Sequence, residues 1–291
     1  MEYSKLINKL QEVFLKQADY FFDKHVPEFI KDGNFLGDYF NQIAVEPLGE
    51  KPPRFYHTFS PFDVISNKSP HYAVVFENGE QLLNIEFDRY VSMRTAAMNA
   101  VLLKVLGIND LSKKKVLIFG SGKIATEAVK ILASEFSLKE IDVISKSGDL
   151  TKLTNSIKNV SIKSGNVDNL SGYDLIICHT KTEKPLISEK NIQNIKHGAI
   201  LTSFISSTEH GEFAEEIYDE TRANIITDWD KTILGAKDLQ RAQEKGLFIE
   251  PMYLQDLLNK QTIDNNKQYT VYRSTGTPIQ NLAVLKLLLE K

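Results

Sequence analysis

Apolar positions near the start of the chain recur at helical spacing. Over residues 3–31 the spacing predicts one or two amphipathic helices. The positions that carry this pattern are Leu6, Ile7, Leu10, Val13, Phe14, Ala18, Phe21 and Phe22. Residues 46–71 lose the pattern and are rich in Pro, Ser, Asn and aromatic residues, which is typical of loops and short strands.

A hairpin and a helix are predicted next. Residues 71–76 and 81–87 are two extended apolar runs, and the Asn78-Gly79 pair between them favours a tight hairpin turn. From about residue 91 to residue 106, small and apolar residues recur on one helical face. Gly107 then predicts the end of that helix.

From residue 116 onward, strand patterns alternate with helix patterns. The strand candidates are 116–119, 141–145, 175–179, 199–204 and 225–229, and the helix candidates are 124–136 and 213–221. Alternation at this spacing predicts a parallel sheet with crossover helices. A further strand over 269–273 and a helix over 278–289 follow after a long gap, so we expect both to return to the first domain.

Composition and charge exclude several classes of function. The chain has 291 residues, enough for about two domains. Lys and Arg total 35 and Asp and Glu total 38, a net charge of −3 that gives no electrostatic case for binding nucleic acid or an anionic membrane. The single cysteine, Cys178, excludes an internal disulfide, and the six histidines form no pair with metal-ligand spacing, so no metal is predicted.

Targeting signals are not evident at the N-terminus. The first residues are polar and lack a secretory apolar core. The longest apolar runs are far shorter than the ~20 residues of a membrane span. We therefore expect a cytoplasmic protein.

The sharpest local motif follows the strand 116–119. It reads Gly120-Ser121-Gly122-Lys123-Ile124-Ala125, and a helix opens at once. In a dinucleotide fingerprint, the first glycine permits a tight turn, the second lets a pyrophosphate approach the backbone, and the last small residue allows helix and strand to pack closely. The strand–turn–helix context favours nucleotide binding over a glycine turn without a ligand.

The tip of the next strand bears on which nucleotide is bound. A carboxylate about 20 residues after the glycines usually binds the ribose of NAD, but this strand ends Ser145-Lys146-Ser147. Two hydroxyls and a cation suit a 2′-phosphate, so we predict NADP(H) in preference to NAD(H). The alternative is that these residues form an ordinary solvated loop and that Asp142 or Asp149 reaches the ribose.

Two other segments carry candidate binding groups. Arg94 lies early in a helix among small residues, where its guanidinium could clamp a carboxylate through two parallel hydrogen bonds. The alternative is a structural ion pair with Glu86 or Asp88. Residues 274–283 predict a second helix N-terminus behind a glycine turn, which could meet an anion or the nicotinamide ring, or could be only a well-capped connection.

Together these segments resemble the ornithine cyclodeaminase/mu-crystallin family. Three carry the resemblance in the family's order: Arg94-Thr95-Ala96-Ala97, the glycine turn 120–125, and the segment 274–283. Weaker matches are Pro53-Arg54, the strand 174–180 and His197-Gly198-Ala199, so the resemblance runs from about residue 50 to the end.

The resemblance implies an α/β fold with two domains. One is a Rossmann-type doubly wound parallel sheet, placed at 108–268. The other is a smaller α/β dimerisation domain, placed at 1–107 and completed by the strand and helix of 269–291. It also implies a nicotinamide cofactor and a homodimer.

Site residues follow by carry-over from the family. Arg94 would bind the substrate carboxylate, and Arg54 would assist. The strand that passes the nicotinamide side of the nucleotide supplies His179 and Thr180, and the turn before the last helix supplies Thr275, Gly276 and Thr277 as further cofactor contacts. The family's 2′-phosphate binders tend to have Asn-Arg-Thr where Ser145-Lys146-Ser147 stands.

Two departures from the family affect the chemistry. The family's lysine motif after the early arginine is shortened here, and Lys68 is present without matching it, which leaves Lys68 as a third substrate-binding candidate. The family's catalytic aspartate is absent from residues 206–211. Glu209 and His210 are the catalytic candidates in its place, and the alternative is that both are surface-loop residues.

The resemblance implies an oxidoreductase that acts on a C=N or CH–NH bond, as an imine or ketimine reductase or an amino-acid dehydrogenase does, and the residues 145–147 make NADP(H) the expected cofactor. The substrate would be a small imino or amino acid, or a larger imine-bearing molecule. Two alternatives stay open. One is an ornithine-type cyclodeaminase with tightly held NAD(P), and the other is a non-catalytic NADP(H)-binding protein.

Overall fold

The chain forms two compact units in a computed structural model. The structure describes residues 1–25, 40–46, 53–60, 70–180, 182, 184–204 and 211–290. Unit 1 comprises Met1–Thr95 and Thr277–Lys291, and unit 2 comprises Ala96–Gly276. The sequence placed the first boundary 12 residues later, at 107/108, and the second boundary 8 residues earlier, at 268/269. Helix α2 (Asp88–Val105) therefore contributes residues to both units.

Unit 1 contains an antiparallel sheet. Its described strands, in spatial order, are β1 (Phe21–His25), β2 (Phe40–Val45), β3 (Arg54–Ser60), β4 (Tyr72–Glu77) and β5 (Glu80–Glu86). The predicted hairpin is confirmed as β4 and β5, and both Asn78 and Gly79 take the positive φ angles that its tight turn requires.

The start of unit 1 differs from the prediction. Helix α1 (Tyr3–Leu15) forms as expected, and a short 3₁₀ turn, Gln17–Asp19, follows it. The expected continuation of helix toward residue 31 is wrong at Phe21 and Phe22, which begin strand β1. Aromatic residues favour strands, and pairing with β2 decides the conformation here.

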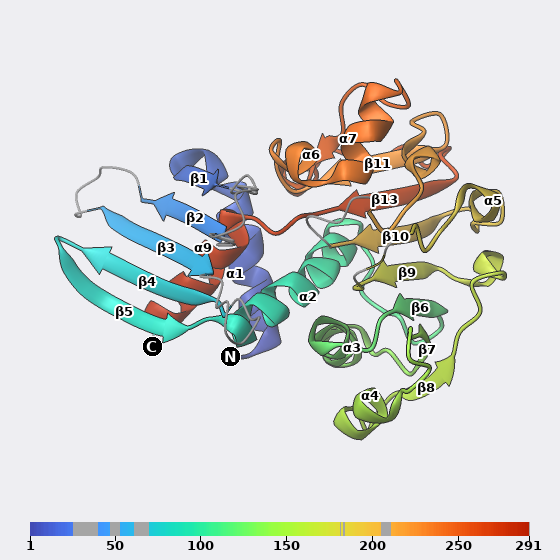
Figure 1. The fold of residues 1–291 in the computed structure, drawn as a ribbon, viewed down its shortest axis with the longest axis horizontal. Helices are drawn as coiled ribbons and strands as arrows, with labels where there is room; N and C mark the ends of the chain where they lie inside the picture. The colour runs from blue at the N-terminus through green and yellow to red at the C-terminus, as the bar shows by residue number, and fades with distance from the viewer. Residues whose placement is uncertain are drawn as a thin grey trace, which may run out of the picture. The chain divides into compact units, whose positions relative to one another are not determined.

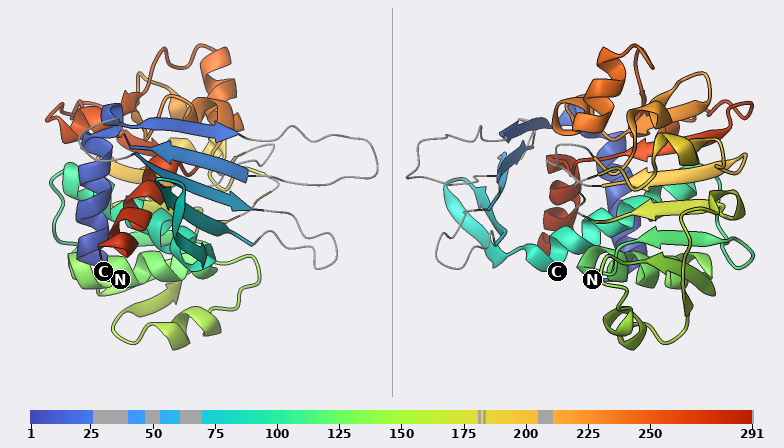
Figure 2. Two further views of the ribbon diagram at one scale, coloured as in Figure 1. Left: turned by 90° about the vertical axis from the view of Figure 1, so that its left-hand side faces the viewer. Right: turned by 45° about the vertical axis from the view of Figure 1, so that its right-hand side comes forward.

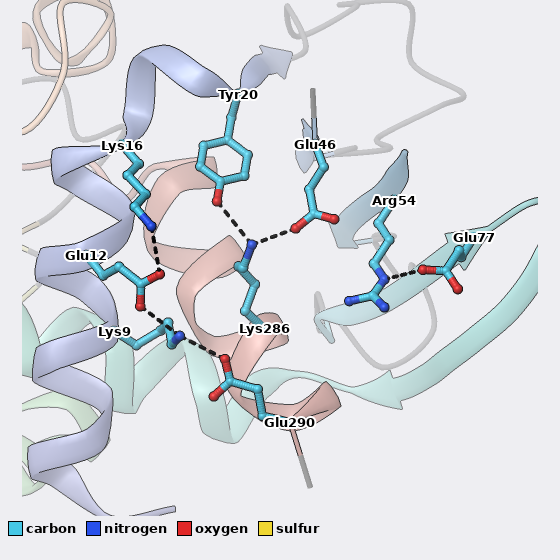
Figure 3. Close-up of polar contacts among 9 residues, drawn as sticks. All are labelled: Lys9, Glu12, Lys16, Tyr20, Glu46, Arg54, Glu77, Lys286 and Glu290. Atoms are coloured by element: carbon cyan, nitrogen blue, oxygen red, sulfur yellow. Dashed lines mark hydrogen bonds and ion pairs between the residues drawn. The ribbon is translucent and has the colours of Figure 1, made fainter. Parts of the chain in front are cut away.

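Two helices from opposite ends of the sequence complete unit 1 (Figure 2). Helix α9 (Pro278–Leu289) packs against β1, β2 and β3, and α1 packs against α9. Polar contacts tie the same elements together (Figure 3). Lys286 on α9 donates to Tyr20 at 3.0 Å and pairs with Glu46 at 2.5 Å, and Lys9 on α1 pairs with Glu290 at 2.8 Å.

Unit 2 contains the predicted parallel sheet (Figure 1). In the described chain, its spatial order is β12 (Met252–Tyr253), β11 (Ala223–Thr227), β13 (Tyr269–Arg273), β10 (Ala199–Ser203), β9 (Leu175–Cys178), β6 (Val116–Phe119), β7 (Glu140–Ile144) and β8 (Ser161–Ser164). Each of these pairings is parallel. The order reverses between β6 and β9, as in a Rossmann-type fold. The predicted fold class is confirmed.

The placement of β13 corrects one expectation. We expected residues 269–273 to return to the first domain together with the last helix, but β13 lies between β10 and β11 in the parallel sheet (Figure 1). All of its residues are buried, as is typical of a strand covered on both faces. Only helix α9 returns to unit 1.

Several helical segments connect the strands of unit 2. Those described are α3 (Lys123–Phe136), α4 (Thr151–Ser156), α5 (Glu189–Ile192), α6 (Thr232–Gly235), α7 (Lys237–Glu244) and α8 (Leu254–Leu258). The helix predicted over 213–221 is only a 3₁₀ segment, Glu215–Tyr218. No helix in the described ranges has the length and apolar character needed to cross a membrane.

Alternating residues of the sheet face different layers. Leu117, Cys178 and Leu201 belong to one apolar cluster, which also contains Leu239 of α7. Thr202 follows Leu201 and accordingly points to the opposite face, where its hydroxyl donates to Asn99 of α2 at 2.8 Å. The part of α2 that belongs to unit 2 therefore lies against the face opposite the cluster.

Candidate functional site

The glycine turn stands at the point where the strand order reverses. Gly120 follows β6 with φ at +113°, and a Cβ atom there would lie 2.7 Å from the carbonyl oxygen of His179. Its backbone N–H donates to Ile144 O at 2.8 Å. Both the angle and the close approach require glycine, so the turn brings the ends of β6, β7 and β9 together.

Helix α3 opens directly behind this turn. Gly122 is its N-cap, and a Cβ atom there would meet nothing within 4 Å. Lys123 and Ile124 form the start of the helix, and Ala125 is fully buried where the sequence predicts close packing. The first N–H groups of a helix carry partial positive charge and lack intrahelical acceptors, so this end suits a phosphate.

Hydroxyl groups link the glycine turn to the tip of β7. The Ser121 Oγ lies 3.0 Å from Ser145 Oγ, which in turn lies 3.1 Å from Ser147 Oγ. A cavity of about 360 Å³ opens beside them. Its lining combines apolar side chains with hydroxyls and two cations: Phe119, Ile144, Ser145, Lys146, Thr180, Thr182, Lys184 and Leu186.

The two carboxylates that could serve the ribose instead have partners within the chain. Tyr173 Oη donates to Asp142 at 2.7 Å. Asp149 accepts from the backbone N–H of Thr151 at 2.8 Å, at the start of α4.

His179 and Thr180 follow β9 at the same edge of the sheet. The His179 ring is buried, packs against Phe204 with 4.9 Å between ring centroids, and lies 3.2 Å from Asn99 Nδ2. The Thr180 backbone N–H donates to Glu212 at 2.8 Å. The His179 ring points away from the face that carries Cys178, because Asn99 lies on the opposite face.

The end of β13 joins this edge from the other side. Ser274 donates through its hydroxyl to Asp228 at 2.7 Å and through its backbone N–H to Ser203 at 3.0 Å. Thr275 and Gly276 follow within unit 2, whereas Thr277 is the N-cap of α9 and belongs to unit 1. The cofactor candidates of unit 2 therefore lie along one edge of its sheet.

A buried ion pair holds β13 below this edge. Arg273 and Asp238 are both fully buried, and the Arg273 Nη2 lies 3.0 Å from Asp238 Oδ1. Tyr218 donates to the other carboxylate oxygen at 2.8 Å. These bonds join β13 to α7, and no local pattern in the sequence predicts them because the partners are far apart in the chain.

Arg94 is held by a network of neutral side chains in unit 1. Its Nε donates to Asn281 Oδ1 at 3.1 Å, and its Nη1 donates to Gln280 Oε1 at 2.5 Å and to Thr95 Oγ1 at 2.9 Å. Asn281 donates in turn to Gln42 at 2.6 Å. These contacts fix the orientation of the guanidinium.

Other predicted residues lie elsewhere. Arg54, the first residue of β3, pairs with Glu77 at 2.6 Å (Figure 3). It stands four residues from Thr58, the β3 residue that contacts Asn281, or roughly 13 Å along the strand. Lys68, Glu209 and His210 lie outside the described residues.

The sequence reading missed Glu212, which is fully buried between two strand ends. One carboxylate oxygen accepts from Thr180 N–H at 2.8 Å, and the other accepts from the Ser203 hydroxyl at 2.7 Å. Burial raises the pKa of Glu212 to about 7, and Asp238 adds to the shift, while these two hydrogen bonds and Arg273 oppose it. In the sequence, the feature that could have drawn attention to Glu212 is its position directly after Gly211.

Metal-ligating side chains do not gather in the described ranges. No group of three or more His, Cys, Asp or Glu residues there could hold an ion. Cys178 is buried, and burial raises the pKa of its thiol well above the ordinary value.

A family model matches residues 71–291, and its description is the ornithine cyclodeaminase/mu-crystallin family. The chain belongs to this family. The match includes the Arg94 helix, the glycine turn and the segment 274–283, which together carried the resemblance. A search of curated proteins finds no match.

Solved structures of low sequence identity share the fold over nearly the full chain. A probable ornithine cyclodeaminase from Bordetella pertussis Tohama I is 19% identical, with a TM-score of 0.82 over 98% of this chain and 91% of that one. The iminosuccinate reductase of Paracoccus denitrificans, in complex with NAD⁺, is 16% identical, with a TM-score of 0.80 over 100% and 92%. The Thermococcus litoralis Δ1-pyrroline-2-carboxylate reductase, in complex with NADH and L-proline, is 16% identical, with a TM-score of 0.78 over 100% and 93%.

Replacing Glu212 by Gln should change how stability depends on pH. The pKa of Glu212 is about 7 in the fold against an ordinary value of 4.5, so the wild type binds more protons when folded and loses stability as pH rises from 4.5 to 7. We expect Glu212→Gln to lack this loss, which is on the order of 3 kcal/mol. Urea unfolding at pH 4.5, 6 and 8 measures it.

The matched control is Glu189→Gln, which alters an exposed glutamate of α5. Its unfolding free energy should follow that of the wild type at every pH. Equal pH profiles for Glu212→Gln and the wild type would contradict the burial argument.

Proposed function

We propose that this chain is an NADP(H)-dependent oxidoreductase that reduces the C=N bond of an imino acid or oxidises the corresponding amino acid. The observation that carries the proposal is the glycine turn at Gly120, at the point where the sheet order reverses and before an open helix N-terminus. Membership of the family and the nicotinamide complexes of two similar folds support it.

The residues at this edge fit a dinucleotide. A pyrophosphate would lie on the N–H groups at the start of α3, where Gly122 leaves open space. The adenosine would enter the cavity between Phe119, Ile144 and Leu186. When bound, the nicotinamide supplies or accepts a hydride at the carbon of the C=N bond.

We propose that the cavity selects NADP(H) over NAD(H). Lys146 and Lys184 line it from the loops after β7 and β9, together with the Ser145 hydroxyl. Two cations and a hydroxyl match a 2′-phosphate. Asp142 and Asp149, the alternative ribose ligands, already accept hydrogen bonds from Tyr173 and Thr151.

Arg94 is the proposed ligand of the substrate carboxylate. Buried arginines favour bidentate binding of a carboxylate because their donors are fixed in a fork. Asn281, Gln280 and Thr95 already hold this fork in one orientation, so little side-chain entropy is lost when an anion binds.

The reaction also needs a proton at the imine nitrogen. Glu209 and His210 stay the candidates to supply it, because they occupy the segment where the family's aspartate is replaced. Without a proton donor, the same cofactor site would belong to a binding protein. An ornithine-type cyclodeaminase would instead release ammonia and recycle its nicotinamide.

We also propose a homodimer formed through the outer face of the antiparallel sheet. Phe21, Val45, Phe55 and Phe76 lie in register across β1 to β4. The three phenylalanines are 66%, 48% and 37% exposed. A row of large exposed apolar side chains marks an interaction site, and a two-fold axis would let two copies cover the same row.

Reductase activity should appear as loss of NADPH absorbance with imines that carry a neighbouring carboxylate. A panel of cyclic and acyclic imino acids tests the substrate class, and esters of the same imines should fail because Arg94 has no anion to bind. Arg94→Lys keeps the charge and loses the fork, so its KM should rise about tenfold or more while its NADPH affinity stays unchanged.

Arg54→Lys is the comparison variant. Because Arg54 already pairs with Glu77, its KM should change less than that of Arg94→Lys. Ammonia release from ornithine without net NADPH loss would favour the cyclodeaminase, and a flat trace with tight NADPH binding would favour the binding protein.

Lys146→Glu should reverse the cofactor preference. The substitution places a carboxylate where a 2′-phosphate would lie and a ribose hydroxyl could donate. We expect NADPH affinity to fall about tenfold or more, since a charge pair is lost and a repulsion gained. NADH affinity should hold or rise. Lys152→Glu, on the exposed surface of α4, should leave both affinities unchanged.

Phe55→Asp should convert the dimer to a monomer. An aspartate in the centre of the apolar row would be buried without a partner. Analytical ultracentrifugation should give twice the mass of one chain for the wild type and the mass of one chain for the variant. Leu234→Asp, at a 71% exposed leucine of unit 2, should stay dimeric.

A further inference from the structure

His179 is fixed at the carboxyl edge of the parallel sheet by its backbone. Its N–H donates to Phe119 O at 3.0 Å, which continues the pairing of β9 with β6. Its carbonyl oxygen lies against the Gly120 turn, only 2.7 Å from where a Cβ of that residue would stand. The backbone that carries the ring is therefore fixed next to Gly120, in the turn that would bind the pyrophosphate.

The orientation of the Asn99 amide decides which ring nitrogen of His179 carries a proton. Asn99 Nδ2 lies 3.1 Å from Ala96 O, and a carbonyl oxygen can only accept, so this end of the amide is the NH₂ group. The other end, Oδ1, accepts from the Thr202 hydroxyl at 2.8 Å. The NH₂ group is thus the end that faces the imidazole.

The same NH₂ group lies 3.2 Å from His179 Nε2. Because Asn99 donates in this contact, Nε2 must accept, and in a neutral ring the proton then sits on Nδ1. Burial lowers the pKa of His179 to about 3, so the ring is neutral at physiological pH. His179 is therefore a fixed hydrogen-bond donor at Nδ1, not a group that exchanges protons near neutrality.

Within the described part of the chain, this donor lacks an acceptor. The Nδ1 atom is buried and has no hydrogen-bond partner among the described residues. A buried donor without a partner has lost its hydrogen bond to water without replacement, and such groups are few in native proteins. Phe204, whose ring packs against the imidazole at a tilt of 30°, holds it in place without satisfying its N–H.

The position of His179 indicates what the acceptor is. The adenosine end of a dinucleotide would occupy the cavity beside β7, and the pyrophosphate would lie on α3. The nicotinamide half must then extend past the point where the strand order reverses, toward the ends of β9 and β10. His179 and Phe204 stand at the ends of those two strands.

We propose that the Nδ1–H of His179 donates to the carboxamide oxygen of the nicotinamide and so fixes the rotation of the ring that exchanges hydride. The inference rests on the proposed cofactor site and deepens it. Asn99 and Thr202 act through His179, because they hold the tautomer that leaves Nδ1 as the donor. The carboxamide oxygen is an acceptor that the adenosine half of the cofactor lacks.

The test compares two ligands on the full chain by calorimetry. NADPH carries both halves of the cofactor, whereas adenosine 2′,5′-bisphosphate lacks the nicotinamide. His179→Phe keeps a ring and loses the donor, so NADPH should bind about tenfold more weakly, as expected for one lost hydrogen bond, while the bisphosphate binds unchanged. His179→Asn places an amide N–H near the position of Nδ1 and should restore most of the NADPH affinity.

The control variant is His197→Phe, which alters an exposed histidine just before β10. It should bind both ligands as the wild type does. Nitrogen NMR of the wild type tests the tautomer without any substitution: Nδ1 should carry the proton, and its resonance should shift with NADP⁺ and stay in place with the bisphosphate.

The outcomes separate the two proposals. If the wild type binds both ligands and His179→Phe loses no NADPH affinity, the role of His179 is overturned and the cofactor site stands. A proton on Nε2 overturns it as well, even if the variants do not fold. If the wild type binds neither ligand, the proposed function fails, and the role of His179 fails with it.

Discussion

The pairing of β13 with β10 on one side and β11 on the other is the interaction on which unit 2 depends. Strands β10 and β11 are not neighbours in the sheet, and β13 joins them by pairing with both. The buried Arg273–Asp238 pair links β13 to α7. The backbone of Ser274 then reaches Ser203 at the next strand end. Because β13 is fixed in this way, the segment that leads to α9 begins at the same edge as the glycine turn.

Buried polar groups in both units are oriented by hydrogen bonds to neighbouring amide groups. Ala96 O sets the Asn99 amide, and Asn99 sets the His179 ring. In unit 1, the amide oxygens of Gln280 and Asn281 set the Arg94 fork. Each arrangement places polar groups in the interior, which lowers the stability of the fold. Each also holds one donor group in a fixed orientation. That is the pattern expected where binding geometry matters more than core packing.

Local signals in the sequence predicted the elements whose conformation is decided locally. The Asn78-Gly79 turn and the β6–Gly120–α3 unit depend on φ angles and apolar runs that neighbouring residues specify, and both are confirmed. Strand β1 was missed because its phenylalanines also fit a helical face, and only pairing with β2 decides between the two.

Features that depend on distant partners could not be predicted. Strand β13 was recognised as a strand, but its neighbours in the sheet are chosen by long-range hydrogen bonding, which no local pattern encodes. The candidate site shows the same division. The sequence located the glycine turn and Arg94, whereas the tautomer of His179 depends on Asn99, 80 positions earlier. The buried state of Glu212 likewise depends on two strand ends that meet only in the fold.

The late position of β13 in the chain has a consequence for synthesis on the ribosome. Strands β10 and β11 are translated first, and each keeps an unpaired edge until β13 has left the exit tunnel, although every residue of both strands is buried in the fold. A nascent chain in that condition presents two templates for pairing with other chains. Translation that stalls between residues 228 and 268 would therefore release a sheet in two open halves, which is the form of this protein that chaperones would be expected to bind.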